Sequence, residues 1–181
     1  MKSTEYEAPC GRLFLGVHGS EICICDWIIG NRISMTLRRI NKFLGGVKQQ
    51  YDGELLEKAR CQLNEYFAGH RVQFDLPLTG VGTEFQRHVW WALKRIPYGE
   101  TVSYSDIAVA VGLPKGVRAV ATAIGANPLS ILIPCHRVIG ANGSLTGYAG
   151  GLDAKRYLLQ LEEVLTRKPF PTTCSKDQFE P

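Results

Sequence analysis

A run of nine residues, Ile131–Ile139, constrains the fold more than any other stretch of this 181-residue chain. It opens with an apolar triplet that has the composition of a buried strand. Pro134 follows, and because proline has no backbone N–H, regular strand pairing should stop there. We therefore expect Cys135 at the point where ordered backbone ends, beside His136 and Arg137.

Cys135 is a candidate nucleophile. A free cysteine has a pKa of about 8.5, and cationic neighbours such as His136 and Arg137 lower it, which favours the reactive thiolate. The alternative is a buried structural thiol, since cysteines are often buried and adjacent side chains rarely face each other. The pair Cys135-His136 alone does not distinguish a nucleophile from a structural thiol, so the decision depends on the rest of the chain.

The composition is that of a globular chain with one large domain or two small ones, with 45% hydrophobic and 21% charged residues. Residues 1–30 lack a basic start followed by a long apolar run, and charges interrupt every later apolar stretch, so we expect neither secretion nor a membrane span. The six cysteines show no disulfide-framework spacing. A reducing cytoplasm is the expected location.

The net charge of +4 is unevenly distributed. Residues 83–161 contain eight lysines or arginines and four acidic residues, whereas the two signs balance in the remainder. An excess of positive charge in one half indicates an anionic partner for that half, and nucleic acid is a common one. A solvated basic helix face would give the same balance.

The amino-terminal part reads as a small sheet with a helix. Residues 12–17 and 22–27 are expected as two strands joined at Gly19-Ser20, and 71–76 as a further strand. Helical spacing of apolar residues predicts a helix over 53–67, whereas 31–53 shows no clear period beyond a short strand. The glycine-containing stretch 77–82 is read as a linker, so residues 1–82 form the first predicted domain.

Cys23 and Cys25 point the same way on a strand and raise the question of a structural zinc, with Cys10 and His18 as further candidate ligands. Structural zinc cysteines usually lie two to four residues apart in a knuckle, and a C-x-C strand is read more simply as small buried hydrophobes. We therefore predict no metal.

Residues 83–165 are predicted to form a second, mainly helical domain, followed by a tail over 166–181. Thr83 is a good N-cap for a helix with one apolar stripe. Two short helices, 103–111 and 117–125, are separated by a glycine-containing turn, which is helix-turn-helix spacing. Arg118 lies at the start of the second helix, where an exposed cation opposes the helix dipole and a nucleic-acid contact would explain it.

Several motifs between Gly82 and Glu162 resemble one known family. They are Gly82-Thr83-Glu84-Phe85-Gln86, Ile96-Pro97-Tyr98-Gly99-Glu100-Thr101, Ser103-Tyr104, Arg118-Ala119-Val120, Asn127-Pro128, Pro134-Cys135-His136-Arg137-Val138-Ile139 and Gly147-Tyr148-Ala149-Gly150-Gly151-Leu152. In this order they are similar to the O6-alkylguanine-DNA alkyltransferases, and to the bacterial members more than the vertebrate ones. The resemblance covers nearly half of the chain.

The resemblance implies an α/β (α+β) fold, with a small sheet-and-helix domain before a winged helix-turn-helix-like domain that binds DNA and carries the catalytic cysteine. It implies DNA repair by irreversible transfer of an alkyl group from O6-alkylguanine, with O4-alkylthymine as a further candidate substrate, to Cys135. Each molecule would react once. The expected partner is double-stranded DNA, and we expect a monomer. No motif for a cofactor, such as a glycine-rich dinucleotide loop, is present.

The same resemblance assigns roles to single residues. Cys135 would be the nucleophile, His136 its base and Glu162 the carboxylate that orients the histidine. Tyr104 would donate toward the leaving base, Arg118 would fill the stack left by a flipped base, and Asn127 would be a hinge rather than a simple helix stop. The base pocket would be walled by Val138, Tyr148, Ala149 and Gly150. Ala149 and Ser130 replace a serine and a proline of some relatives, which bears on the preferred alkyl group.

Two other classes of function use some of the same features. A Cys-His hydrolase would need an oxyanion hole, and no acyl pocket is signalled. A non-catalytic lesion sensor could use the same helix-turn-helix, but sensors built on this fold lack the cysteine that this chain keeps.

Overall fold

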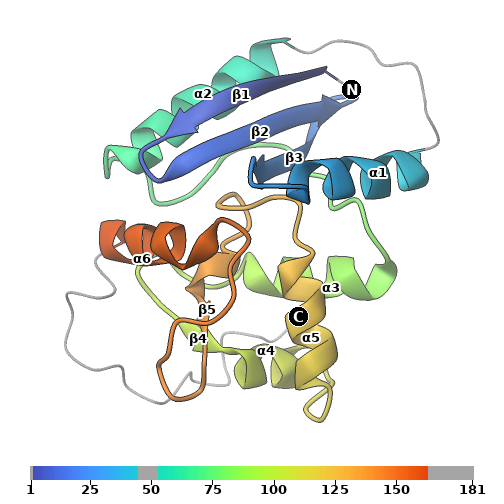
Figure 1. The fold of residues 1–181 in the computed structure, drawn as a ribbon, viewed down its shortest axis with the longest axis vertical. Coiled ribbons are helices and arrows are strands. Elements are labelled where there is room, and N and C mark those ends of the chain that lie inside the picture. The colour runs from blue at the N-terminus through green and yellow to red at the C-terminus, as the bar shows by residue number, and fades with distance from the viewer. Residues whose placement is uncertain (1, 45–52, 163–181) are drawn as a thin grey trace. The chain divides into compact units, whose positions relative to one another are not determined.

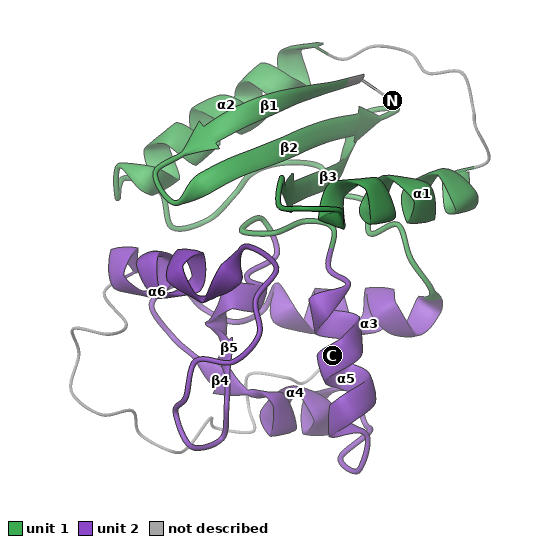
Figure 2. Ribbon diagram, in the orientation of Figure 1, with its two compact units in different colours: residues 1–83, 128–132 green, residues 84–127, 133–181 purple. Residues whose placement is uncertain are grey.

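The computed structural model describes residues 2–44 and 53–162 (Figure 1). The predicted tail over 166–181 lies outside them. The chain forms two compact units: unit 1 contains residues 1–83 and 128–132, and unit 2 contains residues 84–127 and 133–181 (Figure 2). Residues 128–132 thus return to unit 1 just before Cys135. Among the described helices, none is long and apolar enough to cross a membrane.

Unit 1 contains an antiparallel sheet in the order β1 (Lys2–Ala8), β2 (Gly11–His18) and β3 (Glu21–Trp27) (Figure 1). The prediction of strands over 12–17 and 22–27 is confirmed. Their turn includes Gly19, whose φ of +59° suits glycine. Strand β1 was not predicted. Exposure alternates along its residues 3–8, but Tyr6 is the only buried side chain among them, so large apolar residues give little signal.

Helices pack against this sheet. Helix α2 (Gly53–Phe67) confirms the prediction for that segment, and it contacts all three strands. Helix α1 (Arg32–Leu44) occupies a segment for which the sequence suggested only a short strand. Its apolar residues do follow a helical period and pack on Cys23, Ile24 and Val81, but polar and basic residues separate them; they are Ile33, Leu37, Ile40 and Leu44.

The predicted strand over 71–76 is wrong. The side chain of Gln62 on α2 donates to the carbonyl of Asp75 at 3.0 Å and accepts from its N–H at 2.9 Å. These are the two backbone groups that a neighbouring strand would use, so the segment is held by a side chain instead. A single bridge, Ile22 to Leu78, follows it.

Three cysteines of unit 1, Cys10, Cys23 and Cys25, are partly or fully buried. Cys23 and Cys25 are fully buried, and Cys23 packs in the cluster with Ile24, Ile40 and Val81. Burial raises the pKa of Cys10 and of Cys23 to about 11, which disfavours the thiolate that zinc requires. In the described part of the chain, no three His, Cys, Asp or Glu residues are grouped to hold a metal ion.

Unit 2 is mainly helical. Its helices are α3 (Glu84–Leu93), α4 (Tyr104–Ala110), α5 (Val117–Gly125) and α6 (Gly151–Leu161). Two short strands, β4 (Val102–Ser103) and β5 (Val138–Ile139), pair in parallel. The two helices of the predicted helix-turn-helix are confirmed as α4 and α5. Ser103 and Asp106 form a capping box at the start of α4, which defines where that helix begins.

Candidate active site

The backbone makes a tight turn immediately before Cys135. The expected strand over 131–133 is absent. Pro134 has φ −80° and ψ 61°, and the N–H of Cys135 donates to the carbonyl of Ile133 at 2.8 Å, which is an inverse γ-turn. The side-chain amide of Asn127 donates to the same carbonyl at 3.0 Å. The end of α5 is thereby tied to the turn that presents the cysteine.

Cys135 begins a short 3₁₀ turn, Cys135–Arg137, that places the following two side chains on one carboxylate. Cys135 is 5% exposed, whereas His136 and Glu162 are fully buried. Nε2 of His136 lies 2.8 Å from Oε1 of Glu162. The structure therefore pairs two of the residues proposed for proton transfer, Glu162 and His136, the latter next to Cys135 in the chain.

Arg137 completes this cluster in a way that the sequence did not indicate. Its Nε donates to Oε2 of Glu162 at 2.8 Å, its Nη2 donates to Oε1 at 3.1 Å, and its Nη1 donates to the carbonyl of Ile96 at 2.6 Å. The guanidinium is thus engaged with Glu162 and holds the carboxylate in place. The backbone N–H of Gly99 also donates to Glu162 at 3.3 Å.

The electrostatics of this cluster determine the charge of each group. Burial by itself would raise the pKa of Glu162, but the adjacent His136 and Arg137 outweigh it and hold that pKa well below its ordinary value. Burial lowers the pKa of His136, with Glu162 opposing the change. A neutral imidazole beside an ionised carboxylate keeps its proton on Nε2, which leaves Nδ1 as an acceptor. Within the described residues Nδ1 has no hydrogen-bond partner.

Lys155 is a fully buried cation in the same unit. Its Nζ donates to the carbonyl of Val138 at 2.6 Å and to the carbonyl of Thr146 at 2.7 Å. Burial lowers its pKa to about 8, and a thiolate at Cys135 opposes that change. Lys155 therefore cross-links the strand after Cys135 to the loop that precedes α6, and its charge interacts with the cysteine.

The residues predicted to wall the base pocket lie in the two segments that Lys155 connects, or directly after them. Val138 is fully buried in β5. Tyr148 is half-buried, and its ring meets the His136 ring edge-on with 6.3 Å between centroids. Ala149 and Gly150 are half-buried just before α6, and Gly150 is the residue from which that helix starts.

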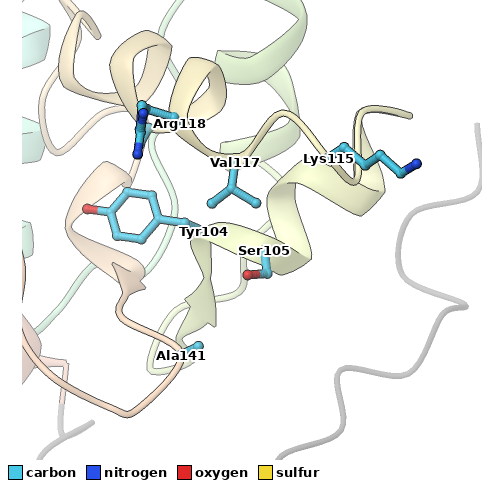
Figure 3. Close-up of a pocket in the computed structure, with 7 residues that line it drawn as sticks. Tyr104, Ser105, Lys115, Val117, Arg118 and Ala141 are labelled. Carbon is cyan, nitrogen blue, oxygen red and sulfur yellow. The ribbon is translucent and has the colours of Figure 1, made fainter.

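Tyr104 and Arg118 share a hollow of about 700 Å³ between α4 and α5. Tyr104 is half-buried and Arg118 is exposed. Figure 3 shows the two side chains at one end of the hollow and Lys115 at the other. Cys135 is not among the residues that line it. The structure thus places these two residues together on the helix-turn-helix surface.

Comparisons with known proteins support one family. The family model described as 6-O-methylguanine DNA methyltransferase, DNA binding domain, matches residues 84–164. The methylated-DNA–protein-cysteine methyltransferase of Mycobacterium tuberculosis is 58% identical over 159 residues, 87% of this chain and 89% of the relative. The chain belongs to this methyltransferase family. The Methanosarcina acetivorans member is 58% identical over 109 residues, 60% of this chain and 70% of that relative.

Solved structures of methyltransferases agree with this assignment. The crystal structure of Mycobacterium tuberculosis OGT in complex with DNA has a TM-score of 0.73 and 43% identity, and the likeness covers 88% of this chain and 91% of that one. The O6-methylguanine-DNA methyltransferase from Pyrococcus kodakaraensis has a TM-score of 0.62, with 88% and 97% of the two chains covered; at 23% identity it supports the fold alone.

Sequence reasoning missed Lys155 in this methyltransferase, and it missed the contact of Arg137 with Glu162. The signal for Lys155 was available on α6. Lys155, Leu158 and Leu159, and Glu162 are spaced as i, i+3, i+4 and i+7, which is one helix face. Charged residues at both ends of an otherwise apolar stripe indicate that each is buried against a partner.

We expect Lys155→Met to slow alkyl transfer about 10-fold, because loss of about 1.4 kcal/mol of stabilisation of the thiolate has that effect on rate. The variant keeps the apolar stem but loses the charge and both donated hydrogen bonds. Single-turnover rates on a methylated duplex provide the measurement. Arg156→Met, on the exposed side of the same helix, is the matched control. Equal rates for the two variants would show that the Lys155 charge has no role.

Proposed function

We propose that this protein repairs double-stranded DNA by moving the alkyl group of O6-alkylguanine onto Sγ of Cys135, once per molecule. The observation that carries the proposal is the buried contact of 2.8 Å between His136 and Glu162, directly beside Cys135, in a member of this methyltransferase family. The Mycobacterium tuberculosis relative was crystallised in complex with DNA, which supports DNA as the partner.

The first step is removal of the thiol proton. Nε2 of His136 is engaged by Glu162, so Nδ1 is the atom that accepts the proton, through one bridging water because adjacent side chains diverge. The imidazolium that forms is stabilised by the Glu162 carboxylate, which Arg137 holds in place. Lys155 offers a positive field to the thiolate.

The second step is an in-line displacement. The Cys135 thiolate attacks the alkyl carbon, the carbon–oxygen bond breaks, and its electron pair remains on O6 of guanine. Tyr104 donates a hydrogen bond toward the leaving base, where negative charge develops. The product is a thioether. Such a carbon–sulfur bond does not hydrolyse as a thioester would, so the protein is consumed.

The target base must leave the duplex before it can react, since O6 lies at the major-groove edge of the base pair and a protein in the minor groove cannot reach it. Arg118 at the start of α5 is exposed on the helix-turn-helix surface, and its planar guanidinium can stack in the vacated position while remaining charged. A minor-groove approach suits an enzyme that must find a lesion in any sequence, because that groove carries little sequence information.

The remaining predicted residues shape the base pocket and connect it to the DNA-binding helix. Val138, Tyr148, Ala149 and Gly150 would wall the flipped base. Asn127 would act as the hinge, since it bonds the turn before Cys135 from the end of α5. We further propose a monomer that acts in the cytoplasm without a cofactor.

The function is tested with a duplex that carries a single O6-methylguanine. After incubation with the protein, nucleoside analysis should find guanine restored in an otherwise unchanged duplex. Unchanged O6-methylguanine, together with cleavage of a peptide or ester substrate, would instead support the Cys-His hydrolase. Tight lesion binding without any repair would support the non-catalytic sensor.

We expect Arg118→Ala to slow repair of a duplex lesion by roughly 5- to 150-fold, the range that corresponds to about 1–3 kcal/mol of lost stacking. Transfer from free O6-methylguanine should change little, because a free base does not need to be flipped. Lys115→Ala, on the same hollow, is the control for loss of positive charge alone. Equal losses on duplex and free base would contradict the insertion role.

A further inference from the structure

The carboxylate of Asp26 is a buried anchor in unit 1. Asp26 lies in β3 and is fully buried. Its Oδ1 accepts from the N–H of Trp27 at 2.9 Å and from Nε of Arg32 at 2.8 Å, and its Oδ2 accepts from the hydroxyl of Thr36 at 2.9 Å. These bonds fix the carboxylate between β3 and α1. The two elements lie side by side in Figure 1. A buried carboxylate is stable only when it is bonded in this way.

The same carboxylate binds the segment that leads to the nucleophile. The hydroxyl of Ser130, which is fully buried, donates to Oδ1 of Asp26 at 3.3 Å. Next to it, the N–H of Cys25 donates to the carbonyl of Pro128 at 2.8 Å, and Cys25 pairs with Leu129. Residues 128–132 are therefore attached to β3 by backbone pairing and by the side chain of Ser130.

Ile131 follows at once and has an unfavourable backbone conformation. Its φ is +71°, the one positive value for a residue other than glycine in the described part of the chain. The N–H of Leu132 donates to the carbonyl of Ser130 at 2.9 Å, so Ile131 is the central residue of a left-handed γ-turn, a rare and strained type. A β-branched residue adopts this region only when its surroundings hold it there.

We propose that Asp26 and Ser130 are positioning residues for the nucleophile, because their bond holds the strained turn at Ile131 from which the chain runs to Cys135. Four residues separate Ser130 from the cysteine, and two of them, Ile131 and Pro134, are centres of γ-turns. The direction of the chain after Ile131 therefore sets where the second turn begins. The proposal rests on the proposed function, in which the placement of Sγ governs the rate.

The chain offers a matched pair of variants to test this. Ser130→Ala and Thr36→Val each remove one buried hydroxyl that donates to Asp26, but only Ser130 belongs to the segment before Cys135. We expect Ser130→Ala to lower the transfer rate at saturating methylated duplex roughly 10-fold, since misplacement of a reacting group by about 1 Å can cost up to about 10²-fold. The duplex concentration at half-maximal rate should stay unchanged. Thr36→Val should keep the wild-type rate.

Hydrogen exchange of the Leu132 amide provides a second measurement that does not depend on activity. It should be faster in Ser130→Ala than in Thr36→Val when the two variants are equally stable to heat. Equal rates of transfer and of exchange in the two variants would overturn the proposal, and would leave Asp26 as a structural residue only.

A third measurement separates this proposal from the proposed function. Carbamidomethylation of Cys135 by iodoacetamide, located by peptide mass spectrometry, needs no DNA. If the proposed function is wrong, the wild-type protein will transfer no methyl group, yet Ser130→Ala will still alter the rate of carbamidomethylation relative to Thr36→Val. If only the positioning role is wrong, the wild-type protein will repair DNA and the two variants will react alike.

Discussion

Cys135→Ser is expected to bind methylated duplex DNA as the wild-type protein does and to transfer no detectable alkyl group. A serine hydroxyl remains protonated at neutral pH, and a neutral imidazole activates it far less than it activates a thiol for attack on an alkyl carbon. DNA binding should persist because Arg118 and Lys115 lie on the exposed helix-turn-helix surface, whereas Cys135 is buried. A gel-shift titration and a repair assay on the same duplex measure the two properties.

Cys61→Ser is the control for this experiment, since Cys61 is exposed on α2 in unit 1. It should repair DNA at the wild-type rate. Residual transfer by Cys135→Ser at a rate near wild type would mean that another side chain is the acceptor.

Glu162→Ala is expected to reduce both stability and transfer. The carboxylate accepts hydrogen bonds from His136, Arg137 and the backbone of Gly99, so its removal leaves a buried guanidinium without its anion. Breaking a buried ion pair in this way typically costs about 3–5 kcal/mol of unfolding free energy. Transfer at saturating DNA should fall by about 10²-fold, because the imidazole loses the group that orients it.

The stabilisation by Glu162 should depend on pH. Its pKa is held below the ordinary value of about 4.3, so its contribution is fully present above that value and is lost as the pH falls toward the folded-state pKa. The difference in unfolding free energy between wild type and Glu162→Ala should therefore narrow below about pH 4. Denaturant unfolding at several pH values measures it. Asp153→Ala, at an exposed position on α6, is the control and should neither lower the unfolding free energy nor change its pH dependence. If the difference between wild type and Glu162→Ala stays constant with pH, the pairing of Glu162 with His136 and Arg137 is contradicted.

Much of the fold could be predicted from local pattern. Strands β2 and β3 and helices α2 to α5 follow from apolar periodicity, glycine turns and an N-cap, which act over a few residues. Helix α1 and the stretch over 71–76 could not, because their conformation depends on distant partners. The side chain of Gln62 replaces a strand partner for Asp75, and α1 is stabilised by packing on Cys23 and Ile24.

In the candidate site, too, local patterns could be predicted and contacts between distant residues could not. The dipeptide Cys135-His136 is visible in the sequence, and the family resemblance pointed to Glu162. The engagement of Arg137 with Glu162 and of Lys155 with two carbonyls depends on tertiary contacts, and neither follows from sequence neighbours. The turn at Ile131 could not be predicted from the sequence for a further reason. An Ile-Leu-Ile triplet favours a strand by composition, and only the bonds around it force a positive φ.

The central claim is that Cys135 is consumed in a single transfer. Mass spectrometry of the protein after incubation with excess methylated duplex tests it most directly. The account predicts that repair stops at one equivalent per protein, with one added methyl group that maps to the peptide containing Cys135, and that S-adenosylmethionine does not change this plateau. Repair that continues through many equivalents, or a methyl group on a peptide without Cys135, would contradict it.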